Sequence, residues 1–262
     1  MHDATRGSSD TPFIELKSVS HSYAGLPVMT DFDLTVHRGE FVSIVGPTGC
    51  GKSTILNLLA GLEAVQGGSI LVDQKKPHAG RPGTGYAFPR DAMLPWRTAI
   101  ENVALPLELA GVRRASRLEQ AEALLRRVGL AGRESSYRSQ LSQGMRQRVA
   151  LARTLITEPT ILFMDEPFAA LDAQTRVLMQ RELLLLLEGG DKTVVFITHD
   201  LDEAISLSDT VVVLSKRPCR IVEHMAITFP RPRSVVDLRL NTAYQDVYGK
   251  LWEALRHDIV EE

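Results

Sequence analysis

The residues best suited to chemistry form a glycine-rich loop, Gly46-Pro47-Thr48-Gly49-Cys50-Gly51-Lys52-Ser53. It follows an apolar run, Phe41–Val45, and opens a helical pattern, Ser53–Ala60, which is the setting that the pattern G-x-x-x-x-G-K-[ST] requires. Glycines let successive backbone N–H groups turn toward phosphate oxygens, and the helix N-terminus adds positive potential. Lys52 can reach the β- and γ-phosphates, and the Ser53 hydroxyl can bind Mg²⁺. The loop therefore predicts a nucleoside triphosphate site.

Two neighbouring carboxylates, Asp165 and Glu166, end a second apolar run, Ile161–Met164. In a parallel sheet, ligands bind at the carboxyl ends of the strands. We expect Asp165 to hold Mg²⁺, directly or through water, and Glu166 to orient or deprotonate an attacking water. Beside a phosphate loop, the pair predicts hydrolysis of the bound nucleotide.

Strands and helices must alternate to bring these residues together. Short apolar runs predict strands at Ile14–Val19, Phe41–Val45, Ser69–Val72, Ile161–Met164, Thr193–Thr198 and Thr210–Leu214. Helical patterns cover Ser53–Ala60, Leu118–Val128, Ala173–Glu188 and a stripe from Tyr244 to Leu255 that we expect to pack on the core. Such alternation predicts a mainly parallel sheet. Because no strand is evident between about 86 and 156, we expect a helical lobe inserted into an α/β core.

Helix ends carry capping signals. Ser116-Arg117-Leu118-Glu119 has the spacing of a capping box, and Gly129 is placed to end that helix. Asp200 and Glu203 repeat the pattern before a short helix, and Gly189-Gly190 closes the helix that starts at Ala173.

Composition excludes several classes of protein. The chain has 262 residues and a formal charge of −2, which gives no general attraction to nucleic acid. Its longest aliphatic run, Leu183–Leu187, is far shorter than the roughly 20 residues that span a bilayer. The polar start, Met1–Gly7, is no signal peptide. With only Cys50 and Cys219, a disulfide framework is not expected, which fits a reducing compartment.

Further motifs, in the right order, make the chain resemble the ATPase subunits of ABC transporters from about Phe13 to Ile227. Leu141-Ser142-Gln143-Gly144-Met145 looks like the family signature LSGGQ, and Arg146–Arg153 after it is also family-like. Ala170-Leu171-Asp172 resembles the D-loop, and Thr198-His199-Asp200 resembles the switch-histidine segment. The resemblance implies an α/β fold: a P-loop NTPase (RecA-like) core with a mainly parallel sheet, an antiparallel β portion and an inserted helical lobe.

The resemblance also implies roles for single residues. Two subunits would close head to tail, with each ATP between the phosphate loop of one and the signature of the other. Ser142 and Gly144 start a predicted helix that runs to about Thr157, and they would face the γ-phosphate in trans. His199 would hydrogen-bond that phosphate and steer the water, Asp172 would couple the two sites, and Tyr23 would stack on adenine. The expected residues are, as catalytic groups, Glu166, His199 and Lys52; as Mg²⁺ ligands, Ser53 and Asp165; and, as ATP-binding residues, Tyr23, Gly46, Pro47, Thr48, Gly49, Cys50, Gly51, Lys52, Ser53, Thr54, Ser142, Gly144 and Asp172.

Two departures from the family pattern stand out. Pro89 occupies the position of the Q-loop glutamine, and proline offers neither a side-chain amide nor a backbone N–H. Gln143 replaces the first signature glycine, and its side chain would crowd the nucleotide if the backbone there needed a positive φ. The first departure suggests slower or differently coupled hydrolysis, and it keeps open the alternative of a nucleotide-binding regulatory subunit.

Three segments are similar to the nitrate/sulfonate/taurine importer branch: Phe163–Arg176, Leu94–Thr98 with Glu101-Asn102-Val103, and Arg217–Ile221. This likeness implies a peripheral subunit on the cytoplasmic face of the inner membrane of a bacterium. Its partners would be a second copy, an integral-membrane permease that docks near residues 89–111, and indirectly a periplasmic or lipoprotein solute-binding protein. The solute would be a small anion.

The predicted organisation is a disordered tail (1–12), an ATPase domain (13–230) with core 13–85 and 157–230 and helical lobe 86–156, and a C-terminal helical tail (231–262). Soluble ABC proteins of DNA repair or translation are a further class. A single cassette without a long heptad run argues against them, and no nucleic acid partner is expected.

Overall fold

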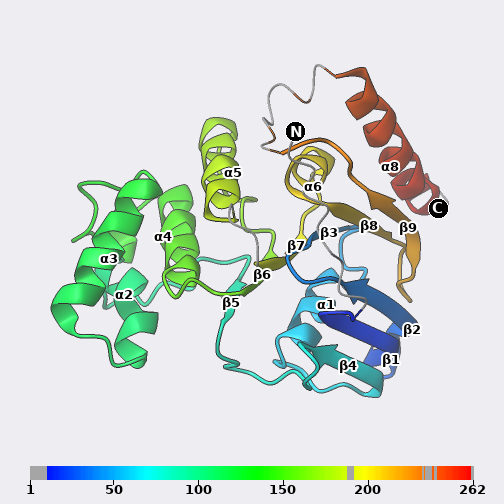
Figure 1. Cartoon of the computed structure of the whole chain (residues 1–262), viewed down its shortest axis with the longest axis horizontal. Coiled ribbons are helices and arrows are strands. Elements are labelled where there is room, and N and C mark those ends of the chain that lie inside the picture. Colours follow the sequence, from blue (N-terminus) through cyan, green and yellow to red (C-terminus); the bar gives the residue numbers. More distant parts are fainter. Residues whose placement is uncertain (1–10, 188–191, 232, 234–237, 239–240, 261–262) are drawn as a thin grey trace.

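The computed structural model describes residues 11–187, 192–231, 233, 238 and 241–260. These residues form two sheets, one of three antiparallel strands in the order β2-β1-β4 and one of six strands in the order β5-β6-β7-β3-β8-β9 (Figure 1). The strands are β1 Ile14–Tyr23, β2 Leu26–Val36, β3 Phe41–Val45, β4 Gly67–Val72, β5 Thr84–Ala87, β6 Ile161–Asp165, β7 Thr193–Ile197, β8 Thr210–Leu214 and β9 Ile221–Ala226.

The larger sheet brings the functional segments to one edge. β6, β7, β3 and β8 are parallel neighbours in that order, and every residue of these strands is buried. Strands covered on both faces need continuous apolar runs, which is why these stretches are rich in Val and Ile. Because parallel strands end at the same edge, the segments after Val45, Asp165 and Ile197 lie next to one another.

Helices cover the sheet and form a lobe beside it. They are α1 Lys52–Leu59, α2 Ala99–Leu109, α3 Arg114–Arg127, α4 Gln143–Leu155, α5 Ala173–Leu187, α6 Leu201–Leu207 and α8 Thr242–Val260, with a short 3₁₀ helix, η1, at Arg138–Gln140. α2, α3 and α4 lie between β5 and β6 in the chain and stand to one side of the sheet, whereas α8 lies at the opposite end, by β8 and β9 (Figure 1). One continuous apolar cluster joins the lobe to the sheet, for example Leu125 and Val103 with Leu162 and Phe196.

The predicted fold class is confirmed, with its parallel sheet, antiparallel strands and inserted helices. All six predicted strands are present, but the sequence analysis missed β2, β5 and β9. β5 has four residues, and β2 and β9 alternate between buried and more exposed positions at sheet edges, so none of them shows a continuous apolar run. Because β5 ends at Ala87, a strand reaches just past residue 86, where none was expected. The proposed division of the chain at residues 85 and 86 remains a prediction.

One capping prediction is wrong. α3 begins at Arg114 without a side-chain cap, and the Ser116 hydroxyl instead accepts a hydrogen bond from Gln120 Nε2 one turn later. The capping box of the lobe lies at α2, where Thr98 and Glu101 bond each other's backbone N–H groups. The predicted cap at Asp200 is confirmed, since its carboxylate accepts from the N–H groups of Asp202 and Glu203.

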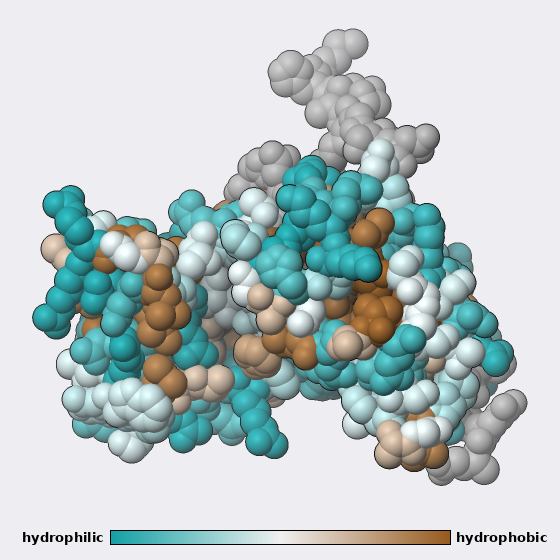
Figure 2. All heavy atoms as spheres, turned by 90° about the horizontal axis from the view of Figure 1, so that it is seen from below, coloured by the Kyte–Doolittle hydropathy of each residue, from teal (hydrophilic) through white to brown (hydrophobic). Residues whose placement is uncertain are grey.

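The C-terminal stripe packs mainly as expected. Tyr244, Leu251 and Leu255 are buried against α6 and β8, while Trp252 is half exposed and faces away from that core. Most of the predicted disordered tail, residues 1–10, and the predicted Gly189-Gly190 helix end lie outside the described residues. In the described ranges, no helix is both long and apolar enough to cross a membrane. Figure 2 shows apolar side chains in separate patches on a largely hydrophilic face.

Candidate active site

The glycine-rich loop joins β3 to α1, as its spacing predicted. Two of its glycines are required by the fold. A Cβ on Gly46 would lie 2.9 Å from the Leu214 carbonyl oxygen, and one on Gly51, whose φ is +129°, would lie 2.6 Å from Val28 Cγ1. A side chain at either position would therefore push the loop off β8 and β2 and change the shape of its backbone.

The Lys52 ammonium group lies inside the loop. The side chain is only 7 % exposed, and Nζ donates to the carbonyl oxygens of Gly46, at 2.7 Å, and Pro47, at 2.9 Å. A buried cation is thus held by neutral oxygens at the N-terminus of α1, where the helix dipole also favours negative charge. An anionic phosphate could replace these two carbonyl contacts with stronger, charge-assisted ones.

Two oxygen ligands meet beside the loop. Asp165 is 4 % exposed, and burial raises the pKa of its carboxyl group, although a hydrogen bond from the Ser53 hydroxyl works in the opposite direction. Glu166 raises this pKa further and Lys52 lowers it. A hydroxyl and a desolvated carboxylate are the hard ligands that Mg²⁺ prefers, so these residues fit the ion predicted here.

Glu166 and His199 face each other at the same edge. His199 Nδ1 lies 3.3 Å from Glu166 Oε2, and both side chains are accessible, at 64 % and 33 % of their full exposure. Glu166 has a φ of +45°, an uncommon conformation for this residue type, and its N–H donates to the carbonyl oxygen of Ile197 at the end of β7. Strained backbone of this kind is concentrated at functional sites.

A buried network holds the histidine segment. The Thr198 hydroxyl donates to Glu203 Oε2 at 2.6 Å and accepts from the Asp200 N–H at 3.0 Å. Arg176 adds an ion pair to Asp200 at 3.5 Å and a hydrogen bond to the Leu171 carbonyl oxygen at 3.2 Å. The segment that contains His199 is therefore tied to the one that precedes Asp172.

Tyr23 lies against α1. Its hydroxyl donates to Glu63 Oε2 and lies 3.5 Å from Thr54 Oγ1, while its ring is 42 % exposed. A half-exposed ring fixed at its hydroxyl end beside the phosphate loop offers a flat apolar face to a planar ligand.

The signature residues lie elsewhere. Ser142 is exposed and caps α4 by accepting from the Met145 N–H, and Asp172 is exposed at the start of α5, where it accepts from the Thr175 N–H. Figure 1 places α4 in the lobe, away from α1. The structure thus brings together Tyr23, the loop, Asp165, Glu166 and His199, but not Ser142 or Gly144. Gln143 is the first residue of α4 and has no positive φ, so the condition for the expected crowding is not met.

Two cationic residues were missed by the sequence analysis. Lys216 and Arg217, in the loop after β8, line a hollow of about 260 Å³ together with Pro47, Thr48, Gly49 and Cys50. The loop is anchored by the buried Cys219, whose N–H donates to the Val28 carbonyl oxygen at 2.8 Å. A basic pair directly after a predicted core strand was the available signal, because such loops lie at the ligand-binding edge.

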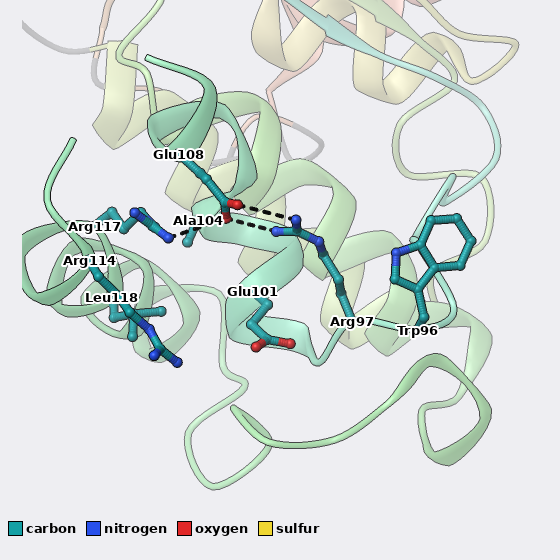
Figure 3. A pocket seen from close by; sticks show the side chains of 8 residues that line it. All are labelled: Trp96, Arg97, Glu101, Ala104, Glu108, Arg114, Arg117 and Leu118. Atoms are coloured by element: carbon teal, nitrogen blue, oxygen red, sulfur yellow. Dashed lines mark hydrogen bonds and ion pairs between the residues drawn. The ribbon is translucent and has the colours of Figure 1, made fainter. Parts of the chain in front are cut away.

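A second hollow, of about 370 Å³, lies on the lobe. Figure 3 shows Glu108 between Arg97 and Arg117, with Trp96 beyond Arg97. Arg97 pairs with Glu108 at 2.8 Å and Arg117 at 3.4 Å, while Trp96 is 71 % exposed. An exposed tryptophan beside fixed charges is typical of an interaction surface.

Comparisons with known proteins agree with this geometry. The family model described as ABC transporter matches residues 29–169. Taurine import ATP-binding protein TauB of Escherichia coli K12 is 44 % identical over 216 residues, which cover 81 % of this chain and 85 % of that protein. An uncharacterized ABC transporter ATP-binding protein of Methanocaldococcus jannaschii is 43 % identical over 233 residues, which cover 89 % and 86 %.

Solved structures are similar as well. A dimeric ATP-binding cassette in a post-hydrolysis state, bound to ADP and Pi, superposes with a TM-score of 0.74 at 30 % identity and covers 83 % of this chain and 100 % of its own. These matches confirm the predicted family, the P-loop fold and an ATPase that serves transport. The chain therefore belongs to the ABC transporter family, as one of its ATP-binding subunits.

Proposed function

We propose that this chain is the ATP-binding subunit of a bacterial importer for a small anion of the nitrate, sulfonate or taurine kind. Two copies would bind ATP head to tail and drive a separate permease. The subunit would lie on the cytoplasmic face of the inner membrane, and a periplasmic or lipoprotein solute-binding protein would deliver the solute. The relatives named for taurine import support the solute class, and the dimeric cassette supports the assembly. The named relatives do not favour the regulatory alternative.

The observation that carries the dimer is the separation of the two halves of the site. The phosphate loop and the acidic pair share one edge of the sheet, while Ser142 and Gly144 lie on the lobe. Gly144 adds a second argument. A Cβ there would meet only ordinary contacts, 3.5 Å from Leu171 Cδ2 and 3.7 Å from the Ala170 carbonyl oxygen, and its φ is not positive. Because the chain's own fold does not require this glycine, close approach of a second molecule is a better reason for it.

Hydrolysis would use the residues in the positions described. Lys52 and the loop N–H groups would bind the β- and γ-phosphates, and Tyr23 would stack on adenine. Ser53 and Asp165 would hold Mg²⁺, which supplies neutralisation of charge on the phosphate oxygens. Glu166 would accept the proton of the attacking water, and His199, 3.3 Å from it, would hydrogen-bond the γ-phosphate. Ser142 and Gly144 of the second copy would complete the site, with Asp172 between the two.

The lobe hollow would receive the permease. It lies in the segment expected to dock, and it combines the exposed Trp96 with the fixed carboxylate of Glu108. Trp252, half exposed on α8 at the far end of the chain, offers a matched control. In purifications from native membranes, we expect Trp96→Ala to lose most of the permease that accompanies the wild type and Trp252→Ala.

The experiment that tests the catalytic site is Glu166→Gln. The amide keeps the shape of the side chain but cannot accept the proton, so ATP binding is retained and hydrolysis falls by a factor on the order of 10²–10⁴. Binding is measured by equilibrium titration and turnover by phosphate release. Full hydrolysis by this variant would refute Glu166 as the general base.

A further inference from the structure

Asp91 lies between the sheet edge and the signature. It belongs to the loop that leaves β5, and β5 pairs with β6 so that Ala87 is opposite Met164, the residue before Asp165. The side chain is only 11 % exposed. Arg138 donates to both of its oxygens, from Nε at 3.1 Å and from a terminal nitrogen at 3.3 Å. Asp91 is therefore a fixed anion with a bidentate partner.

A second arginine connects Asp91 to the signature itself. Arg146 Nε donates to Asp91 Oδ2 at 3.1 Å, while its NH1 group donates to the Leu141 carbonyl oxygen at 2.8 Å. Leu141 precedes Ser142, and Arg146 lies in the first turns of α4. One guanidinium group thus spans the loop and the residue that leads into the signature.

The backbone of the same loop is held by α4 from its other end. Arg153 donates to the carbonyl oxygens of Asp91, at 3.1 Å, and Ala92, at 2.9 Å. Asp91 Oδ1 also accepts from the Met93 N–H at 3.0 Å, so the carboxylate fixes its own loop as well. Burial alone would raise the pKa of Asp91, but the hydrogen bonds from Arg138 and Arg146 outweigh it and lower the pKa. The carboxylate is accordingly ionised at neutral pH.

We infer that Asp91 is a positioning residue that orients the signature helix, and with it Ser142 and Gly144, for the nucleotide held by a second copy. This inference rests on the proposed function. Asp91 touches no reacting atom in it, and acts through Arg146 and α4. Since Pro89 removes the glutamine amide two residues earlier, the Asp91 carboxylate is the side-chain connection that this loop offers between the strand beside Asp165 and the signature.

The test separates binding in one copy from closure of two. In the full chain carrying Glu166→Gln, which is expected to trap the ATP-bound dimer, we compare Asp91→Asn with the unmodified reference. The affinity of the single chain for a fluorescent ATP analogue is expected to stay within about twofold. ATP-dependent dimerisation, followed by analytical ultracentrifugation, is expected to weaken by about tenfold or more, which lies in the usual range for coupling between sites. Asp91→Glu should recover part of the loss, because it restores the charge.

Asp73→Asn is the matched control. Asp73 also pairs with two arginines, Arg38 at 2.7 Å and Arg81 at 2.9 Å, but none of these residues contacts the lobe in the described contacts. Dimerisation that is unchanged in Asp91→Asn, or weakened equally in Asp73→Asn, would overturn the inference. If Asp91→Asn does not fold, Arg146→Lys takes its place, since one ammonium group cannot span both Asp91 and Leu141. A reference that binds ATP but never dimerises would overturn the proposed function and this inference together.

Discussion

The side chain of Asn102 fastens the loop that presents Trp96. Its amide group donates to the carbonyl oxygens of Leu94 at 3.2 Å, Arg97 at 3.1 Å and Thr98 at 2.9 Å. Its Oδ1 accepts from the Leu94 N–H at 2.8 Å, and the residue is fully buried. Asn102→Ala removes all four hydrogen bonds and leaves the loop without its attachment to α2.

The size of the effect follows from these contacts. A buried hydrogen bond is worth about 0.5–1.5 kcal/mol net. Because the loop residues are only partly buried, water can replace some of the lost partners, which gives a loss of about 2–4 kcal/mol in the free energy of unfolding. For a chain of this size, each kcal/mol shifts the melting temperature by roughly 2–4 °C. We therefore expect a decrease of about 5–15 °C.

Thermal and urea denaturation measure this loss, with Gln120→Ala as the control. Gln120 is an exposed amide on α3 with a single bond to Ser116, and its loss is expected to change stability by less than about 0.5 kcal/mol. Asn102→Asp keeps the acceptor but turns a carboxylate oxygen toward three carbonyl groups. It should be at least as destabilising at pH 7 and partly recover at low pH, where the protonated acid can donate again. Equal stability of Asn102→Ala and Gln120→Ala would refute the reasoning.

Three further predictions concern the nucleotide site. Because burial raises the pKa of Asp165, its ionised form costs stability above the folded-state pKa, and that cost disappears below the unfolded-state value near 3.8; Asp165→Asn should melt higher than the wild type at pH 7 without Mg-ATP, converge with it in acid, and gain less from Mg-ATP, as followed by thermal scans across pH. Arg217→Gln should weaken ATP binding by roughly 3–10-fold at low salt through lost attraction to the phosphates, whereas Arg220→Gln, which lines a different hollow, should not; equal affinities would contradict the role given to the loop after β8. Pro89→Gln should raise the steady-state ATPase rate of the assembled protein, because glutamine supplies the missing amide, and equal rates would reject the idea that Pro89 slows turnover.

The sequence predicted those parts of the site that depend on short segments. β3, the loop and α1 follow one another within a few residues, and β6 leads directly into Asp165 and Glu166, so apolar runs and glycines located them. It could not predict the contacts of Asn102 or Asp91. Both side chains find partners that are set by the packing of the lobe, and Asp91 reaches across 47 positions to Arg138 and 55 positions to Arg146.

Backbone conformation was the second limit. The expected crowding at Gln143 depended on a positive φ, and the start of α4 at that residue removes the condition. At the start of α3, capping-box spacing competed with helix propensity, and the helix begins earlier, at Arg114, where arginines extend it. Spacing alone does not show which of two adjacent turns is the first one of a helix.

The loop between β5 and α2 links three surfaces that act on different molecules. Its first residues leave the sheet beside β6, which ends at Asp165, Asp91 joins it to the residue before Ser142, and Asn102 fixes its last part, which exposes Trp96. The Met93 N–H bonds Asp91 and the next one, of Leu94, bonds Asn102, so the two anchors hold adjacent peptide groups. A displacement of Trp96 by a bound permease would therefore be transmitted to Asp91 across a single residue, and from there through Arg146 to the signature. In this chain, the connection between partner and nucleotide can run through a carboxylate and an amide that flank the position where the family glutamine is absent.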